Sequence, residues 1–211
     1  MARQGRFITL EGGEGAGKST QARRLAVALR EAGVDVVETR EPGGSPGAEE
    51  IRRLLTTGEP NRWSPMAETL LHFSARADHV RRTIRPALND GQWVCCDRFA
   101  DSTMAYQGYG HGVDRGFISM LATAVLGDLR PDLTLVFDIP VEQGLARAAK
   151  RPGQEDRYEK MDRKFHEALR RGFLEIAAND PQRCAVIAAA GDEEDTWQLV
   201  RAAVSARLGT I

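Results

Sequence analysis

Cysteine is scarce in this chain of 211 residues, which has only Cys95, Cys96 and Cys184. Their number is odd and their spacing fits no metal-ligand pattern, which argues against a disulfide framework and against a zinc site. Cys95 and Cys96 are neighbours in a strand pattern and would point to opposite faces of a sheet. We therefore expect them to be small buried apolar side chains.

Long apolar runs and a strong charge imbalance are also missing. No run approaches the length of a membrane-spanning helix, and the N-terminus enters a glycine-rich motif too soon for a signal peptide. The formal net charge is -1, so bulk charge does not favour nucleic-acid binding. With 42% hydrophobic and 28% charged residues, the composition is typical of one globular domain over residues 1–211. We expect a cytoplasmic protein that binds neither nucleic acid nor membrane.

Short apolar runs alternate with longer helical patterns along the chain. The runs predict buried strands at residues 7–10, 34–37, 93–96, 133–137 and 184–188. Apolar stripes with helical spacing lie within residues 22–29, 70–84, 161–176 and 197–208. This alternation predicts an α/β fold, a three-layer αβα sandwich with a central five-stranded parallel sheet that binds ligands at the carboxyl ends of its strands. Charged breaks rich in proline and glycine at 40–47 and 150–156 predict loops.

The stretch "ITLEGGEGAGKSTQ" contains a phosphate-binding pattern. Gly12, Gly17, Lys18 and Ser19 match G-x-x-x-x-G-K-[ST], with a strand pattern before them and a helical pattern after them. Backbone N–H groups of such a loop surround an anion, while Lys18 reaches the outer phosphates and Ser19 offers its hydroxyl to Mg²⁺. A glycine-rich turn with a surface lysine is the alternative. The predicted loop comprises Gly12, Gly13, Glu14, Gly15, Ala16, Gly17, Lys18, Ser19 and Thr20.

A triphosphate loop alone is compatible with a nucleotide kinase, a regulatory GTPase, or a motor or transport ATPase. The GTPase motifs N-K-x-D and D-x-x-G are absent, as is an L-S-G-G-Q-like stretch, and the length suits a small kinase. Asp97 follows the apolar run 93–96 and would emerge beside the loop, where it can hold the water shell of Mg²⁺. Its alternative role is to cap the adjacent turn or to form a salt bridge there.

Five stretches, in this order, resemble bacterial thymidylate kinases over nearly the whole chain. They are "FITLEGGEGAGKST" (7–20), "TREPGG" (39–44), "LLHFSARADH" (70–79), "DRFADSTMAYQG" (97–108) and "DRYE" (156–159). The resemblance implies a P-loop kinase that transfers phosphoryl from ATP to dTMP, with Mg²⁺ as cofactor. It also implies a homodimer and a helical lid at about residues 141–160.

The resemblance further implies where the thymine base binds. Phe73 would stack on the ring and Arg76 would hydrogen-bond its carbonyl edge. Thr103 and Gln107 would read the base edge, and Tyr106 would pack against the deoxyribose. From the residues alone, Phe73 could equally belong to the core stripe of its helix, Arg76 could be solvated, and "STMAYQG" could be only a capped turn.

The acceptor phosphate and sugar are implied to meet charged residues. Arg98 would hold the monophosphate through its planar fork. Arg40 would lie near the same phosphate, unless it only pairs with Glu41, and Glu14 would face the 3'-hydroxyl of the sugar. The expected dTMP-binding set is thus Glu14, Arg40, Phe73, Arg76, Arg98, Thr103, Tyr106 and Gln107.

The phosphate loop "GGEGAGKS" contains no arginine. The chain therefore resembles the subtype in which lid arginines assist the transfer, here Arg151 first, then Arg147, with Arg157 beyond them. We expect the catalytic set to be Lys18, Arg98, Arg147, Arg151 and Arg157. The alternative is that these cations complement a helix dipole and that Asp156 and Glu159 form a capping box.

Two other functions stay open. One is a kinase for another nucleoside monophosphate or for a deoxynucleoside. The other is a protein that uses ATP to switch conformation and has no acceptor site.

Overall fold

A single parallel sheet organises the computed structural model, which describes residues 5–150 and 157–209. Its strands are β1 (Phe7–Gly12), β2 (Val36–Arg40), β3 (Trp93–Asp97), β4 (Leu133–Asp138) and β5 (Cys184–Ala188). They lie in the order β2-β3-β1-β4-β5, and every neighbouring pair is parallel. The five-stranded parallel sheet is therefore confirmed. Since β1 is central, the chain that follows it leaves from the middle of the carboxyl edge.

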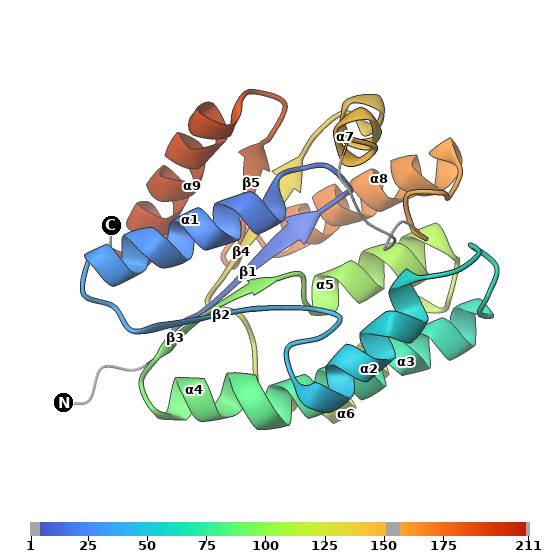
Figure 1. The fold of residues 1–211 in the computed structure, drawn as a ribbon, viewed down its shortest axis with the longest axis horizontal. Helices are drawn as coiled ribbons and strands as arrows, with labels where there is room; N and C mark the ends of the chain where they lie inside the picture. The colour runs from blue at the N-terminus through green and yellow to red at the C-terminus, as the bar shows by residue number, and fades with distance from the viewer. Residues whose placement is uncertain (1–4, 151–156, 210–211) are drawn as a thin grey trace.

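Helices cover both faces of the sheet, as Figure 1 shows, which confirms the three-layer fold. Over one face lie α1 (Lys18–Glu31) and α9 (Glu193–Leu208). The other helices are α2 (Pro46–Thr56), α3 (Pro65–His79), α4 (Arg85–Asn89), α5 (Ala100–Thr103), α6 (Arg115–Leu126), α7 (Val141–Ala148) and α8 (Arg163–Asn179). Two π-helical segments, η1 (Val80–Ile84) and η2 (Met104–Gly110), extend α3 and α5. None of the described helices is long and apolar enough to cross a membrane.

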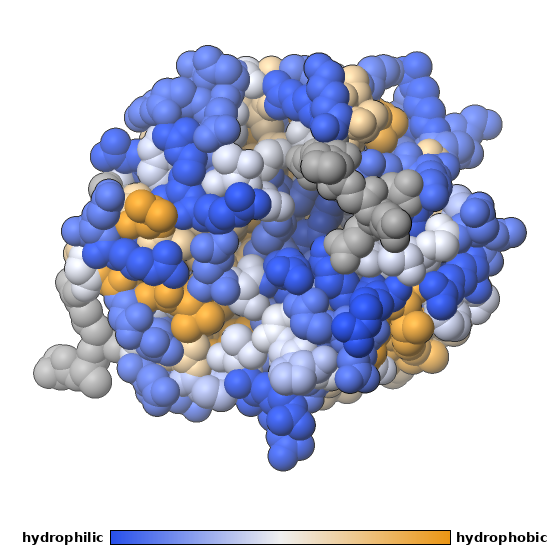
Figure 2. All heavy atoms as spheres, in the orientation of Figure 1, coloured by the Kyte–Doolittle hydropathy of each residue, from blue (hydrophilic) through white to orange (hydrophobic). Residues whose placement is uncertain are grey.

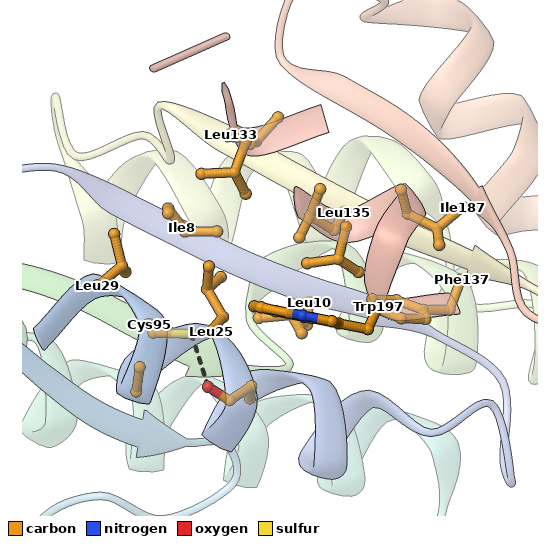
Figure 3. Close-up of a cluster of buried hydrophobic side chains, with 14 of the residues drawn as sticks. Ile8, Leu10, Leu25, Leu29, Cys95, Leu133, Leu135, Phe137, Ile187 and Trp197 are labelled. Carbon is orange, nitrogen blue, oxygen red and sulfur yellow. Dashed lines mark hydrogen bonds between the residues drawn. The ribbon is translucent and has the colours of Figure 1, made fainter. Parts of the chain in front are cut away.

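The alternation of side chains along β1 builds two separate cores. Ile8 and Leu10 point towards α1 and α9 and pack in the cluster drawn in Figure 3. Phe7 points to the opposite face, where its ring meets Phe99 edge-on at 4.9 Å between centroids. Because side chains alternate with a period of two, Glu11 lies on the same face as Phe7. This face carries α5 and η2, which belong to the functional site.

The two adjacent cysteines lie on opposite faces of the sheet, as predicted. Cys95 packs in the core beneath α1, while Cys96 packs with Phe7 and Phe99 on the other side. Both are fully buried and free, and Cys184 is also a buried free thiol. Burial raises the pKa of the Cys95 thiol above its usual value. These side chains therefore act as small apolar groups.

The predicted bounds of β2 and the predicted loop at 40–47 are only partly right. The strand runs over Val36–Arg40 rather than 34–37 because β2 is an edge strand whose polar residues face solvent. Helix α2 begins inside the predicted loop, at Pro46, with Ser45 at its N-cap. Proline is well suited to a first helical turn, where its missing N–H is not needed. Helices α2 and α6 were not predicted, whereas α7 lies within the helical segment expected at about residues 141–160.

Candidate active site

A cleft of about 810 Å³ opens at the carboxyl ends of β1, β2 and β3. Figure 2 shows that the surface is hollowed between α1 on one side and α2 and α3 on the other. Residues of the phosphate loop line one side, namely Glu14, Lys18 and Ser19. The predicted residues that also line the cleft are Arg40, Arg76, Asp97, Arg98, Thr103, Tyr106 and Gln107. The fold thus brings a phosphate loop and a second polar surface into one cavity.

The conformation of the phosphate loop depends on glycines at close contacts. Gly12 has φ 134°, and a Cβ there would lie 2.5 Å from the carbonyl oxygen of Phe137. Gly15 has φ 67°, and a Cβ there would lie 1.8 Å from the carbonyl oxygen of Gly144 in α7. Both positions therefore exclude larger residues. The loop leads directly into the N-terminus of α1, which favours an anion.

Lys18 stands at the start of α1 and is almost completely buried. Its Nζ donates to the carbonyl oxygen of Gly13 at 2.6 Å. Burial and the nearby positive charge of Arg98 lower the pKa of Lys18 to about 8, although Glu14 and Asp97 act in the opposite direction. An anionic phosphate in the cleft would favour the charged form of this lysine.

Ser19 and Asp97 form the pair expected at a magnesium site. The Ser19 hydroxyl donates to Oδ2 of Asp97. The other carboxylate oxygen, Oδ1, is buried and has no hydrogen-bond partner in the described part of the chain. Within that part, no three His, Cys, Asp or Glu residues cluster as metal ligands. This donor set fits Mg²⁺ held by few protein oxygens, with water and phosphate as its other ligands.

Arg98 links the phosphate loop to η2. Its Nη1 donates to the carbonyl oxygen of Gly12 at 2.9 Å, and its Nη2 lies 2.9 Å from Oε1 of Glu14. Glu14 also accepts from the Tyr106 hydroxyl at 2.6 Å. Burial alone would raise the pKa of Glu14, but the charges of Arg98 and Lys18 outweigh it and lower the pKa to about 2. Among the described residues Arg98 is the one non-glycine with positive φ, at 70°, a strained conformation typical of functional sites.

Glu11, which belongs to none of the predicted site residues, supports the turn that carries Arg98. Its fully buried carboxylate accepts from the backbone N–H of Phe99 at 2.8 Å and from the Ser102 hydroxyl at 2.5 Å. Burial raises the pKa of Glu11 to about 7, with the Asp101 charge acting in the same direction and Ser102 and Arg98 opposing it. The sequence signal that could have identified Glu11 is a charged residue near the end of a buried strand.

The raised pKa of Glu11 predicts a pH dependence of stability. Between pH 4.5 and about 7, Glu11 stays protonated in the folded chain but ionises in the unfolded chain, so the free energy of unfolding falls as pH rises. Glu11→Gln should abolish this fall, which amounts to about 3 kcal/mol over the window. Burial lowers the pKa of His72 to about 4, so His72 makes the free energy of unfolding rise with pH over a similar range. The test is therefore the difference in the free energy of unfolding between Glu11→Gln and the wild type, measured by urea unfolding at each pH. Parallel pH profiles would contradict the assignment.

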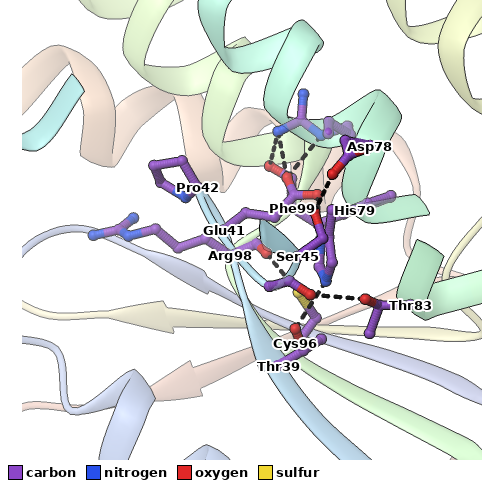
Figure 4. Close-up of polar contacts among 12 residues, drawn as sticks. Thr39, Glu41, Pro42, Ser45, Asp78, His79, Thr83, Cys96, Arg98 and Phe99 are labelled. Carbon is purple, nitrogen blue, oxygen red and sulfur yellow. Dashed lines mark hydrogen bonds and ion pairs between the residues drawn. The ribbon is translucent and has the colours of Figure 1, made fainter. Parts of the chain in front are cut away.

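Arg76 is held from three sides but keeps one free donor. Its Nε donates to Oε2 of Glu41 at 2.8 Å, and its Nη2 donates to the Phe99 carbonyl and to the Thr103 hydroxyl, both at 3.0 Å. Glu41 also meets Nδ1 of His79 at 3.0 Å, as Figure 4 shows. The remaining nitrogen of Arg76, Nη1, is buried and has no partner among the described residues. Glu41 thus pairs with Arg76, not with Arg40 as the sequence alternative suggested.

Gln107 offers an unpaired acceptor in the same cleft. It lies in η2, where it is fully buried, and its Nε2 donates to Oε1 of Glu68 at 2.7 Å. Its own Oε1 has no partner in the described ranges. A π-helical segment inside a helix is frequent at functional sites. The side chains of Arg76 and Gln107 therefore present one donor and one acceptor.

Phe73 and Arg40 are placed differently from the expectation. Phe73 is 3% exposed, packs with Val113 and Ile118, and is not among the residues that line the cleft. The guanidinium of Arg76 lies 5.0 Å from its ring centroid. Stacking of Phe73 on a base therefore stays a prediction. Arg40 lines the cleft, but its half-exposed side chain pairs with Glu49 at 3.1 Å.

The predicted lid arginines do not share one environment. Arg147 donates to the carbonyl oxygens of Ala189, Ala190 and Gly191, which tie α7 to the end of β5. Arg157 is fully buried and does not line the cleft. Its nitrogens contact Glu68 and three carbonyl oxygens of residues 55–60. In this structure Arg157 therefore joins its own segment of the chain to residues 55–68, and a catalytic role for it stays a prediction. Arg151, like the other residues of 151–156, lies outside the described ranges.

A phosphate loop at the start of α1, facing a second set of arginines across one cleft, defines a P-loop phosphotransferase. A family model described as thymidylate kinase matches residues 10–200. The thymidylate kinase of Caulobacter vibrioides is 54% identical over 98% of this chain and 99% of its own length. That of Rhizorhabdus wittichii is 53% identical over 94% of this chain and 96% of its own length.

A solved structure agrees with these sequence matches. The crystal structure of thymidylate kinase from Ehrlichia chaffeensis superimposes with a TM-score of 0.76 at 35% identity, over 94% of this chain and 98% of that one. The chain therefore belongs to the thymidylate kinase family.

Proposed function

We propose that this chain transfers the terminal phosphoryl group of Mg-ATP to dTMP, producing ADP and dTDP. The observation that carries the proposal is the pairing, in one cleft, of a phosphate loop with an unpaired donor and an unpaired acceptor. Family membership supports ATP and dTMP as the two substrates. We further propose that residues 1–211 act as one kinase domain with a lid at about 141–160.

The two unpaired groups match the edge of thymine. The Nη1 of Arg76 can donate only, and the Oε1 of Gln107 can accept only. Thymine presents a carbonyl acceptor, O4, next to an N3–H donor, whereas cytosine presents an amino donor next to an N3 acceptor. Arg76 and Gln107 would therefore pair with thymine and would both be mismatched by cytosine. Buried polar groups left unpaired by a wrong substrate discriminate strongly.

The charged groups of the cleft would align the two phosphates. Lys18 and the N–H groups of the loop would bind the outer phosphates of ATP, while Arg98 would hold the phosphate of dTMP. An oxygen of that phosphate forms the new bond to the γ-phosphorus as the bond to the ADP oxygen breaks, so the protein supplies alignment and charge neutralisation. Ser19 and Asp97 would hold Mg²⁺, which supplies further positive charge to the phosphates. Tyr106 and Glu14 would contact the deoxyribose.

Initial rates of ADP formation with several acceptors test this function. The wild-type chain should give the highest kcat/KM with dTMP when dTMP, dUMP, dCMP, UMP and thymidine are compared at saturating Mg-ATP. A clear preference for another acceptor would contradict the substrate and favour a different nucleoside or nucleotide kinase. If no acceptor stimulates ADP formation, the chain is an ATP-driven switch protein rather than a kinase.

We also propose a homodimer that forms through α3 and α6. These two helices pack against each other, and large apolar side chains on them remain exposed, including Met66 and Leu70 at 45% and Met120 at 58%. Covering such side chains with a second copy would remove apolar area from water. Sedimentation should then give twice the chain mass of 23.2 kDa, and a monomer at micromolar concentration would contradict the proposal.

The free cysteines support a cytoplasmic location.

A further inference from the structure

A buried chain of polar contacts lies directly behind the base-reading amide of Gln107. Glu68, on α3, is 1% exposed and does not line the cleft. Its Oε1 accepts from Nε2 of Gln107 at 2.7 Å, and its Oε2 lies 2.5 Å from Nη1 of Arg157. His111 Nε2 lies 3.5 Å from Oε1. Three segments that are distant in sequence therefore meet at one carboxylate.

The ionised state of Glu68 determines how the amide of Gln107 is oriented. Burial would raise the pKa of Glu68, but His111, His72 and Arg157 outweigh it and lower the pKa to about 2. An ionised carboxylate has no proton to donate and can only accept. The NH₂ of Gln107 must therefore face Glu68, and its Oε1 is left for the cleft. The acceptor character of Gln107 towards a ligand is thus set from behind.

Arg157 in turn donates to Glu68 and so requires a hydrogen-bond acceptor at position 68. It donates to the carbonyl oxygens of Leu55, Glu59 and Pro60 at 3.2, 3.0 and 2.6 Å. With these contacts satisfied, its fully buried guanidinium can turn only an N–H towards residue 68. A carboxylate or amide side chain at position 68 is therefore expected to direct an oxygen at Arg157.

We propose that Glu68, held by Arg157, is a positioning residue that makes the site selective for a pyrimidine with an N3–H group. It acts through Gln107 and does not touch the substrate. The proposal rests on the proposed function, because it assumes that dTMP occupies this cleft. It adds a determinant of base selectivity outside the cleft wall.

Glu68→Gln tests the proposal because it preserves shape while removing the acceptor-only character. Arg157 would attract the oxygen of the introduced amide, so the new NH₂ group would face Gln107 and reverse the amide of Gln107. The kcat/KM of the variant with dTMP should then fall about tenfold or more, because the N3–H of thymine would meet the NH₂ of the reversed Gln107 amide. The mismatch with N3 of dCMP would be relieved, so the dTMP to dCMP ratio of kcat/KM should fall further. The KM for ATP should stay unchanged.

Two further variants separate this role from loss of structure. Glu68→Asp keeps an ionised acceptor and should keep a selectivity ratio close to that of the wild type. Asp101→Asn weakens a comparable pair, since Asp101 lies 2.5 Å from Arg183. Because Asp101 is not the carboxylate that accepts from the Gln107 amide, the ratio should not change in this variant.

Should Glu68→Gln fail to fold because it leaves the charge of Arg157 buried and unpaired, the double variant Glu68→Gln with Arg157→Met removes both charges. It should show a smaller fall in the same ratio, because the Gln107 amide is then free to reverse. Equal losses with dTMP and dCMP, or an unchanged ratio in a folded variant without the carboxylate, would overturn the proposal. A wild-type chain inactive with dTMP would instead contradict the proposed function.

Discussion

Arg98→Ala is expected to lower kcat/KM for dTMP by about 10²- to 10³-fold, the loss typical when a preorganised charge is removed from a transition state. The guanidinium lies between the phosphate loop and η2, 2.9 Å from both the Gly12 carbonyl and Glu14. Its Cζ also lies 5.0 Å from the ring centroid of Tyr106. Steady-state kinetics with dTMP varied at saturating Mg-ATP measure the loss.

Arg98→Gly is the matched control for this substitution. Because the residue has φ 70°, glycine relieves backbone strain that alanine would keep, so Arg98→Gly should be more stable than Arg98→Ala by about 1 kcal/mol. Both variants should nevertheless show the same loss of kcat/KM, because both lack the guanidinium. Activity close to wild type in a folded Arg98→Gly variant would exclude Arg98 from catalysis. Equal stability of the two variants would contradict the strain.

The parts of the fold that the sequence predicts well are those with strong local patterns. The strands β1, β3 and β4 are mainly apolar runs because they are buried on both faces. The edge strand β5 is partly exposed but was still predicted, because all five of its residues are apolar. The edge strand β2 was misplaced because two of its five residues, Glu38 and Arg40, are charged and exposed. Helix α6 was missed because "RGFISMLATAVL" is apolar on nearly every side and lacks a clear helical stripe. The eight-residue α7 is too short to show a reliable apolar period, so its helix was expected only from the family resemblance.

For the site, local motifs identify which residues matter but not what holds them. The glycine pattern predicted the phosphate loop, and Ser19 and Asp97 meet as expected across 78 residues of sequence. The supporting carboxylates were missed because their partners are distant along the chain. Gln107 lies 39 positions from Glu68, and the carbonyls that surround Arg157 are about 100 residues away in sequence. The sequence pattern at Arg157 therefore gave no sign that this charge is buried among backbone carbonyls, and its catalytic role stays a prediction.

The absence of an arginine from the phosphate loop makes a lid arginine the expected source of charge at the transferred group. Of the three candidates, Arg157 is buried, and Arg147 is engaged by three backbone carbonyls. Moving the guanidinium of Arg147 would leave those carbonyls without a partner, which costs free energy. Arg151, which lies outside the described residues, is therefore the arginine that we propose for the transfer.

Arg151→Ala should lower kcat at least tenfold, and by up to about 10³- to 10⁵-fold if the group acts as a full arginine finger. ATP affinity measured by calorimetry should be largely kept, since the loop and Lys18 are intact. Arg147→Ala is the matched comparison from the same segment: it should lower the free energy of unfolding, because α7 loses its contacts with the end of β5, and should reduce kcat less. A larger fall in kcat for Arg147→Ala than for Arg151→Ala would mean that the three carbonyl contacts are not maintained during catalysis. Arg147 would then be the arginine that stabilises the transferred phosphoryl group.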